Sequence, residues 1–169
     1  MKKKLIFLVI GILVLGAASS GYIYSFFMIA KLEKTVQKPI PIGFATFYPG
    51  NQIGKKLGYF TSAITLEDSK IEFGENKITI PVMDITISGT KAIMKSAFAE
   101  GTLNQLQKAN LEIKSIQIET DADKISQLST EIEAKFLAEQ INIKNGDNAI
   151  KLNDFKLNGN RIDHNFWDN

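Results

Sequence analysis

Few residues of this chain have the types and spacings that support catalysis or metal binding. His164 is the only histidine among 169 residues, so the sequence excludes a metal site built from several histidines. We interpret His164 as a surface residue. Asp121 and Asp123 match the start of a calcium-binding loop, but the glycine and the closing glutamate that such a loop needs do not follow. We interpret this pair as part of a charged turn.

Asp84 and Asp154 are a second candidate pair, because each begins a similar hexapeptide, Asp84–Gly89 and Asp154–Gly159. Two carboxyl groups that converge are able to act as a general acid and a general base. We interpret them instead as residues that bind nearby backbone amides or face solvent. The sequence also contains no cysteine, no nucleophile motif and no phosphate-binding glycine loop. We therefore expect no enzyme, no catalytic residue, no cofactor and no metal.

An apolar run without charged residues, Leu5–Ala30, follows three lysines, Lys2–Lys4. A helix of this length spans about 39 Å, which exceeds the ~30 Å hydrocarbon core of a bilayer. The run therefore predicts a membrane anchor over residues 1–30. A cleaved signal peptide is the alternative, because Leu5–Leu15 fits a signal core and Gly16-Ala17-Ala18 fits a cleavage site.

The lysines before the apolar run favour a cytoplasmic N-terminus, although further lysines after the run reduce the asymmetry. We predict a single-pass protein of the inner (cytoplasmic) membrane with an extracytoplasmic C-terminal domain. Small residues four positions apart, such as Ala17 and Gly21, match a helix-packing motif. We interpret them as lipid-facing residues.

The rest of the chain is long enough for one domain with a core of its own. Without Lys2–Lys4 the chain has 17 basic and 18 acidic residues. This balance excludes a basic surface for nucleic acid. Pro39 and Pro41 favour an extended path after the apolar run. We assign residues 31–57 to a proline-containing stalk and turn-rich linker, and residues 58–169 to an extracytoplasmic β-rich domain.

Apolar residues then recur in one pattern: two alternate, two other residues intervene, and two more alternate. These positions scatter around a helix but fit a strand. Because the gap shifts the alternation by one residue, we expect the buried face to change within each strand. The four sets are Ile80, Val82, Ile85 and Ile87; Leu111, Ile113, Ile116 and Ile118; Phe136, Ala138, Ile141 and Ile143; and Ile150, Leu152, Phe155 and Leu157.

Two long hairpins follow from this pattern and from two turn signals, Asn145–Asn148 and Gly74–Lys77. Their matching ends indicate either a weak internal duplication or the same local arrangement reached twice. The expected pairs are Ile143 with Ile150, Ile141 with Leu152, Ala138 with Phe155 and Phe136 with Leu157 in one hairpin, and Phe73 with Ile78, Ile71 with Ile80, Leu66 with Ile85 and Ile64 with Ile87 in the other.

Three segments complete the predicted fold. Lys91–Glu100 fits a strand and a helix equally, and residues 123–135 fit either a helix or the start of a strand. Thr102–Gln105 matches a capping box and predicts a short helix to Ala109. The predicted fold class is mainly β, a curved antiparallel sheet of long hairpins with one or two short helices and an N-terminal transmembrane helix.

Gly58–Leu66 resembles the glycine-aromatic-Phe-Ser-Ser first strand of YdgA-like periplasmic proteins, and the repeated hairpins are similar to those of AsmA-like proteins. The resemblance covers Met1–Gly89 loosely. It implies a single-pass bacterial envelope protein with a curved sheet whose apolar face handles lipid or outer-membrane cargo. It brings no catalytic residue.

We therefore expect a non-enzymatic, membrane-anchored envelope protein that binds lipid or a protein partner in envelope assembly. The alternative is a structural accessory subunit of a membrane complex. An apolar groove and an aromatic pair are the candidate binding sites, and packing within the domain is the alternative role for both. The groove candidates are Ile64, Leu66, Ile85, Ile87, Phe155 and Leu157, and the candidate docking residues are Phe166 and Trp167.

Overall fold

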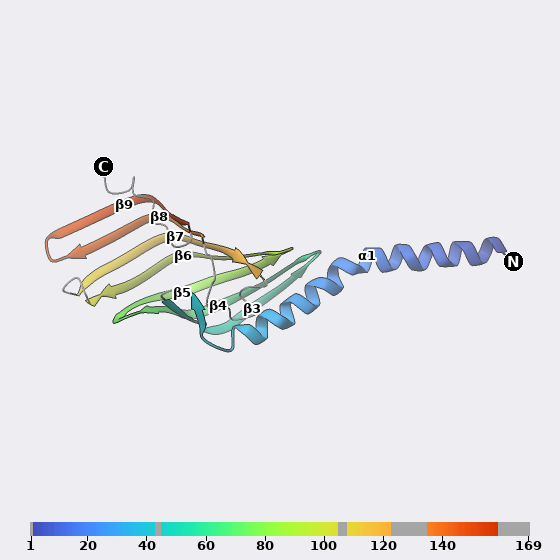
Figure 1. Ribbon diagram of the computed structural model, residues 1–169, viewed down its shortest axis with the longest axis horizontal. Coiled ribbons are helices and arrows are strands. Elements are labelled where there is room, and N and C mark those ends of the chain that lie inside the picture. Colours follow the sequence, from blue (N-terminus) through green and yellow to red (C-terminus); the bar gives the residue numbers. More distant parts are fainter. Residues whose placement is uncertain (1, 43–44, 105–107, 123–134, 159–169) are drawn as a thin grey trace.

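The computed structural model describes residues 2–42, 45–104, 108–122 and 135–158. Within these ranges, one long helix is followed by nine strands that form a single curved antiparallel sheet (Figure 1). The predicted mainly-β fold with an N-terminal apolar helix is confirmed. The elements are α1 (Lys2–Thr35), β1 (Ile40–Ile42), β2 (Ala45–Tyr48), β3 (Asn51–Gly58), β4 (Thr61–Phe73), β5 (Asn76–Ser88), β6 (Lys91–Leu103), β7 (Ala109–Asp121), β8 (Lys135–Asn145) and β9 (Asn148–Asn158).

The strands follow one another across the sheet in the order β1-β2-β4-β5-β6-β7-β8-β9, and β3 also pairs with β4. β4 thus has β5 on one side, and on its other side β3 along its first half and β2 along its second half. The first three strands come from the segment that the sequence assigned to a stalk and linker. That segment is part of the sheet, and α1 ends only at Thr35, shortly before Pro39.

Three hairpins share one turn geometry. Their two-residue loops are Gly74-Glu75, Gly89-Thr90 and Gly146-Asp147, and the glycine comes first in each. Its φ is 59°, 58° and 57° respectively. A positive φ at the first loop residue is the mark of a type II′ turn, which matches the twist of the flanking strands and favours glycine at that position.

The register of the β8–β9 hairpin is as predicted, with Ile143 opposite Ile150 and Ala138 opposite Phe155. The predicted register of the β4–β5 hairpin is wrong by two residues. Leu66 lies opposite Met83, and Ile71 lies opposite Ile78. The two-residue turn is shorter than the four-residue turn expected, and buried serines occupy two inward positions of β4. Ser62 is 1% exposed and Ser69 is 0% exposed. A prediction based on apolar residues alone does not identify these serines as buried.

The ambiguous segments are also placed. Lys91–Glu100 lies in β6, so the strand reading of this segment is correct. The short helix expected from Thr102 to Ala109 is wrong at both ends, because Thr102 belongs to β6 and Ala109 begins β7. Lys135 begins β8, and residues 123–134 lie outside the described residues.

The strands are irregular along one line across the sheet. Asp68 in β4, Ser115 in β7 and Asp154 in β9 have φ values of 58°, 53° and 53°. The pairing is interrupted there but resumes in the same register, as between Glu67–Val82 and Ser69–Ile80. Two residues that are not buried lie at the same level in both strands, between Leu66 and Ser69 in β4 and between Ile80 and Met83 in β5, so neither strand slips along the other.

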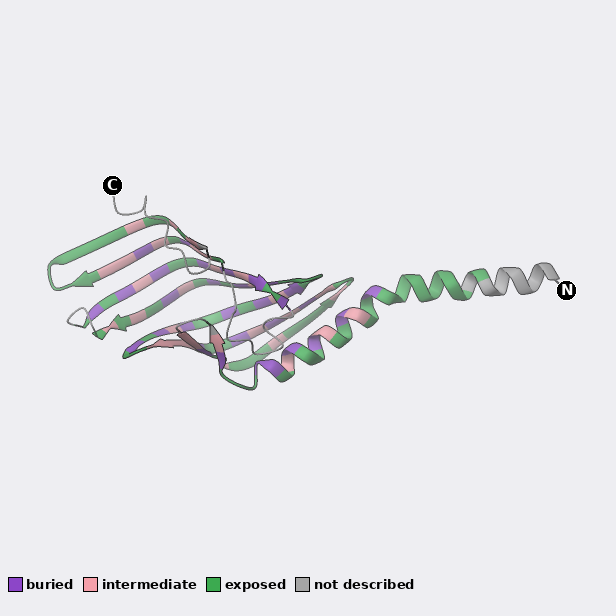
Figure 2. Cartoon of the chain, in the orientation of Figure 1, coloured by how far each residue is buried: buried purple, intermediate pink, exposed green. Residues whose placement is uncertain are grey.

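These irregular positions keep the apolar side chains on one face. A single residue in a left-handed conformation reverses the alternation, which offsets the reversal that the gap in the sequence produces. Ile113 and Ile116, on either side of the gap in β7, are both buried in the same hydrophobic cluster, and so are Ile80 and Met83 in β5. The predicted change of buried face within each strand is therefore wrong. Figure 2 shows buried residues alternating along both halves of the long strands.

The two halves of α1 differ. Ile29 and Leu32 in the C-terminal half are each 2% exposed and belong to the same cluster as Ile64 and Leu66 of β4. The described side chains from Ile12 to Ser20 are all exposed. This N-terminal half projects beyond the sheet (Figures 1 and 2). One continuous helix therefore serves both as part of the domain core and as an extension from it.

Substitutions of two adjacent residues in β5 test which of them faces the core. Met83 is 0% exposed, whereas Val82, which the sequence pattern placed inside, is 45% exposed. We expect Met83→Ala to lower the free energy of unfolding by about 2–5 kcal/mol because it leaves a cavity, and Val82→Ala by less than ~1 kcal/mol. Urea unfolding of the two full-length variants in detergent measures both values. A larger loss for Val82→Ala would show that Val82, and not Met83, faces the core.

Candidate functional site

The six candidate groove residues fall into two groups. Four of them lie on β4 and β5 and are sealed in the core, with exposed fractions between 0% and 4%. The other two lie on β9 and are half-buried. The first group packs within the domain, which is the alternative role given for these residues. The sealed residues are Ile64, Leu66, Ile85 and Ile87, and the half-buried residues are Phe155 and Leu157.

The candidate carboxylates are not brought together. Asp84 is exposed and accepts a hydrogen bond from Thr65 Oγ1 at 2.6 Å. Asp154 is exposed on β9, with β6, β7 and β8 between the two strands. Four strand spacings of ~4.8 Å separate them by about 19 Å, which excludes an acid–base pair.

The other chemical candidates do not form a site in the described part of the chain. Asp121 is exposed at the end of β7. His164, Asp123, Phe166 and Trp167 lie outside the described residues. Within the described ranges, no three histidine, cysteine, aspartate or glutamate residues form a group that holds a metal ion.

A contact that the sequence did not predict joins α1 to the loop between β3 and β4. We call this loop, Tyr59 and Phe60, the aromatic tip. Tyr59 Oη donates a hydrogen bond to the Ala17 carbonyl oxygen at 3.2 Å, and the Phe60 backbone N–H donates to the Gly21 carbonyl oxygen at 3.3 Å. The Tyr59 ring also packs edge-on against Tyr22, with 5.6 Å between ring centroids. The tip is thereby held against the middle of the helix.

Glycine at position 21 makes this close approach possible. A Cβ atom on Gly21 would lie 2.4 Å from a carbon of the Tyr59 ring, whereas a Cβ on Gly16 would meet nothing within 4 Å. The interpretation of Gly21 as lipid-facing is therefore wrong. The absence of a side chain at Gly21 leaves room for the Tyr59 ring of the same chain, and this contact holds the β3–β4 hairpin against the helix.

Two more hydrogen bonds join the next turn of α1 to the sheet. Tyr24 Oη donates to the carbonyl oxygen of Gly89, in the β5–β6 turn, at 2.9 Å. Ser62 Oγ donates to the Ser25 carbonyl oxygen at 2.7 Å, in a buried position. Within the described residues, Ser25 Oγ is itself buried without a hydrogen-bond partner. The helix is thus tied to two separate hairpin ends.

A polar contact marks the C-terminal part of the helix. Gln52 Nε2 and Lys55 Nζ, both on β3, donate to the same oxygen of Glu33 at 2.9 Å and 3.2 Å. Glu33 lies two turns after Tyr24 and Ser25. The surface of the helix–sheet contact therefore changes from aromatic at the tip to charged farther along β3.

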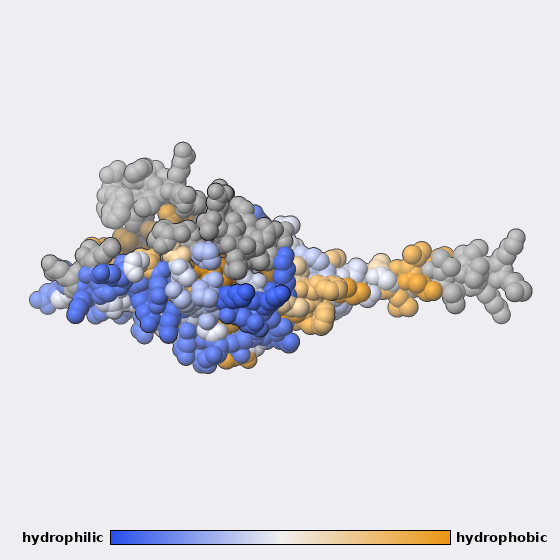
Figure 3. All heavy atoms as spheres, turned by 60° about the horizontal axis from the view of Figure 1, so that its bottom comes forward, coloured by the Kyte–Doolittle hydropathy of each residue, from blue (hydrophilic) through white to orange (hydrophobic). Residues whose placement is uncertain are grey.

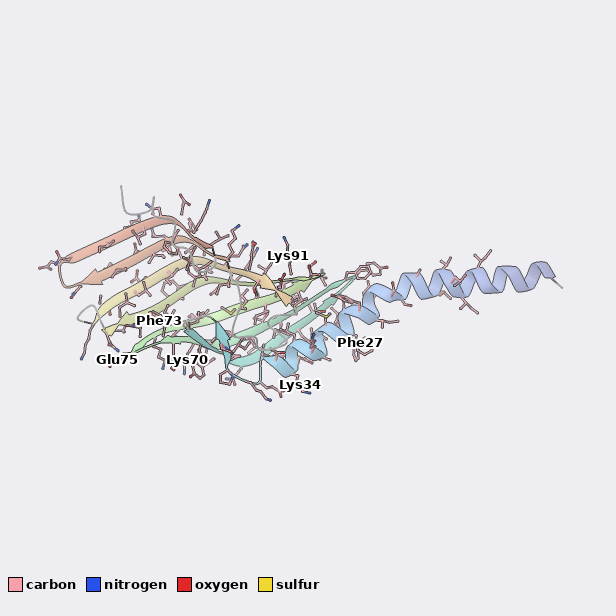
Figure 4. All side chains as sticks on the ribbon, in the orientation of Figure 1. Phe27, Lys34, Lys70, Phe73, Glu75 and Lys91 are labelled. Carbon is pink, nitrogen blue, oxygen red and sulfur yellow. The ribbon has the colours of Figure 1, made fainter. Side chains whose placement is uncertain are left out.

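Large apolar side chains remain exposed where the helix meets the aromatic tip. Figure 3 shows hydrophobic atoms continuing from α1 onto the adjoining end of the domain, while much of the same view of the domain is hydrophilic. In Figure 4, Phe27 projects from the helix on the side away from the strands. The residues concerned, with exposed fractions from 45% to 68%, are Tyr22, Ile23, Phe26, Phe27, Tyr59 and Phe60.

A second apolar surface lies at the other end of the sheet, on β8 and β9. Ile150 is 58% exposed, and Leu152, Phe155 and Leu157 are half-buried. The Phe155 ring packs edge-on against Phe136 with 5.8 Å between centroids.

Comparison of the chain with protein-family models, with curated proteins and with solved structures gave no match.

Glycine substitutions in α1 test the contact with the aromatic tip. Gly21→Leu forces the Tyr59 ring away from the helix, and we expect this overpacking to destabilise the protein by about 1–3 kcal/mol. Gly16→Leu is the matched control, because it adds the same side chain to the same helix without a neighbour. Thermal unfolding in detergent compares the two. Equal stability of the two variants would contradict the contact.

A pair of serine substitutions tests the buried hydrogen bond. Ser62→Ala removes the donor to the Ser25 carbonyl, and we expect it to lower the free energy of unfolding by about 1 kcal/mol. Ser25→Ala removes only an unpaired hydroxyl, so it should be neutral or slightly stabilising. Urea unfolding measures both effects. The opposite order would show that the serines have other partners.

Proposed function

We propose that this chain is a non-enzymatic, membrane-anchored envelope protein that binds lipid through the apolar face of its curved sheet. The anchor is the N-terminal part of α1. In this helix, the segment Ile12–Thr35 is long and apolar enough to cross a membrane by length and composition. Lys2–Lys4 favour a cytoplasmic N-terminus, with the sheet outside the inner membrane.

The observation that carries lipid binding is the incomplete burial of the apolar face toward β9. The face is sealed at β4 and β5, where α1 packs on it. On β9, Ile150 is exposed, and Leu152, Phe155 and Leu157 are only half-buried. A surface of aliphatic and aromatic groups fits an acyl chain better than a charged or sugar ligand.

The alternative role, a structural accessory subunit of a membrane complex, has an observation of its own. Four of the six groove candidates are sealed in the core, as in a domain whose apolar face serves stability alone. In that case β9 would contact a protein subunit, and the sheet would hold that subunit at a fixed place beside the membrane.

Site-specific photocrosslinking separates the two roles. A benzophenone amino acid replaces Phe155, on the apolar face of β9, and in a control variant it replaces Lys156, which is exposed on the opposite face. We expect a lipid adduct, identified by mass spectrometry of the protein from irradiated membranes, at position 155 and not at 156. An adduct to one protein at position 155 would favour the accessory subunit. Absence of any adduct at 155 would contradict lipid binding by this face.

A further inference from the structure

We propose that the aromatic tip, Tyr59 and Phe60, sits within the membrane interface, so that one end of the sheet is immersed in the membrane that holds α1. This inference rests on the proposed membrane anchoring of α1. It adds an interaction surface, the lipid headgroup and acyl-chain boundary, on a part of the domain distinct from the apolar face at β9.

The first step of the argument is the length of helix that the domain leaves free. Lys2–Lys4 set one limit of the apolar segment, and Tyr59 Oη contacts the helix at Ala17. Only residues 5–16 lie between these limits, and they span about 18 Å of helix. A hydrocarbon core is ~30 Å thick, so about 12 Å of it extends past the point where the tip begins.

The second step locates the outer boundary of the hydrocarbon core along α1. Along a helix that starts in the hydrocarbon at Leu5, ~20 residues cross the core, which places the far boundary near Tyr24. Tilting the helix uses more residues and immerses the tip further. The Glu33–Lys55 ion pair, with 3.2 Å between its nitrogen and oxygen, lies two turns beyond that boundary, where charged groups remain hydrated. The boundary therefore falls between the aromatic tip and this ion pair.

The third step is the chemistry of the side chains at that level. Tyrosine is enriched at membrane interfaces because its ring is apolar and its hydroxyl is polar. Tyr22 and Tyr59 are 56% and 47% exposed, and Phe26 and Phe27 beside them are 61% and 68% exposed. An exposed cluster of large rings on an otherwise polar domain marks an interaction surface. A lipid boundary at this level accommodates the rings, and the Tyr59 hydroxyl, on the deeper side, is satisfied by the Ala17 carbonyl oxygen at 3.2 Å.

The arrangement also orients the domain. The tip lies at one end of β3 and β4, while Lys70 and Phe73 lie toward the opposite end of β4, away from the projecting helix (Figure 4). Tyr48 on β2 pairs with Lys70 and is 38% exposed. From Thr61 to Lys70 the strand rises by about 30 Å, which places Tyr48 far outside the immersed end.

Tryptophan fluorescence in lipid vesicles tests the immersion. The native Trp167 is replaced by phenylalanine, and single tryptophans are introduced in the full-length chain by Tyr59→Trp, Phe60→Trp, Tyr48→Trp or Leu13→Trp. Each protein is reconstituted into vesicles of phosphatidylethanolamine and phosphatidylglycerol, with and without lipids brominated near the headgroup or deep in the acyl chains. We expect shallow bromines to quench the tip tryptophans more strongly than deep bromines do, because apolar side chains at an interface enter about 5–10 Å into the boundary between headgroups and acyl chains. Tyr48→Trp should lose none.

The variants separate failure of this inference from failure of the anchor. Quenching of Leu13→Trp by deep bromines without quenching of either tip variant would keep the anchor and overturn the immersion. Absence of quenching for Leu13→Trp as well would overturn both proposals. Quenching of Tyr48→Trp would mean that the whole sheet lies on the membrane, which also overturns immersion of the tip alone. Because Tyr59→Trp must fit against Gly21, Phe60→Trp decides the outcome if Tyr59→Trp does not fold.

Discussion

The packing of the C-terminal half of α1 on β3 and β4 is the contact on which the rest of the structure depends. Ile29 and Leu32 cover Ile64 and Leu66, so the first part of the sheet acquires its core from a helix that also leaves the domain. Fully burying such a side chain stabilises a protein by roughly 1.5–3 kcal/mol relative to exposure. The same contact fixes the direction in which the helix projects from the sheet.

The close contacts at the helix depend on residues with little or no side chain. Gly21 leaves room for the Tyr59 ring, and the small Ser25 and Ser62 allow the helix backbone to approach β4 within hydrogen-bonding distance. Larger side chains at these positions would hold the helix away from the sheet. The tip and the core contact would then be lost together, because both lie on one continuous helix.

The long strands meet a second constraint, which is to keep thirteen residues of apolar alternation on one side of a curved sheet. The irregular residues Asp68, Ser115 and Asp154 do so by restoring the alternation at the point where the sequence pattern shifts. They have left-handed backbone conformations, which cost energy for residues other than glycine, and aspartate tolerates them better than most. Bulged positions also bend strands, so the same residues contribute to the curvature of the sheet.

Much of the fold was determined by local sequence. The apolar run predicted the helix, and the Asn145–Asn148 turn predicted every expected pair of the β8–β9 hairpin, because the apolar patterns of β8 and β9 mirror each other about a glycine turn. Alternation likewise predicted the buried residues of β7. These features depend on period and turn chemistry, which a single segment carries by itself.

Only the tertiary structure decided the register of β4–β5 and the contact at the aromatic tip. Ser62 is buried because a backbone carbonyl of α1, 37 residues away, accepts its hydrogen bond, and no pattern within β4 reveals that partner. Gly21 and Tyr59 similarly acquire their roles from each other. The buried face of each strand depends on backbone conformation at one residue, which alternation alone does not specify. Polar burial and close approach arise between distant segments, so they follow from the assembled fold and not from the periodicity of any one strand.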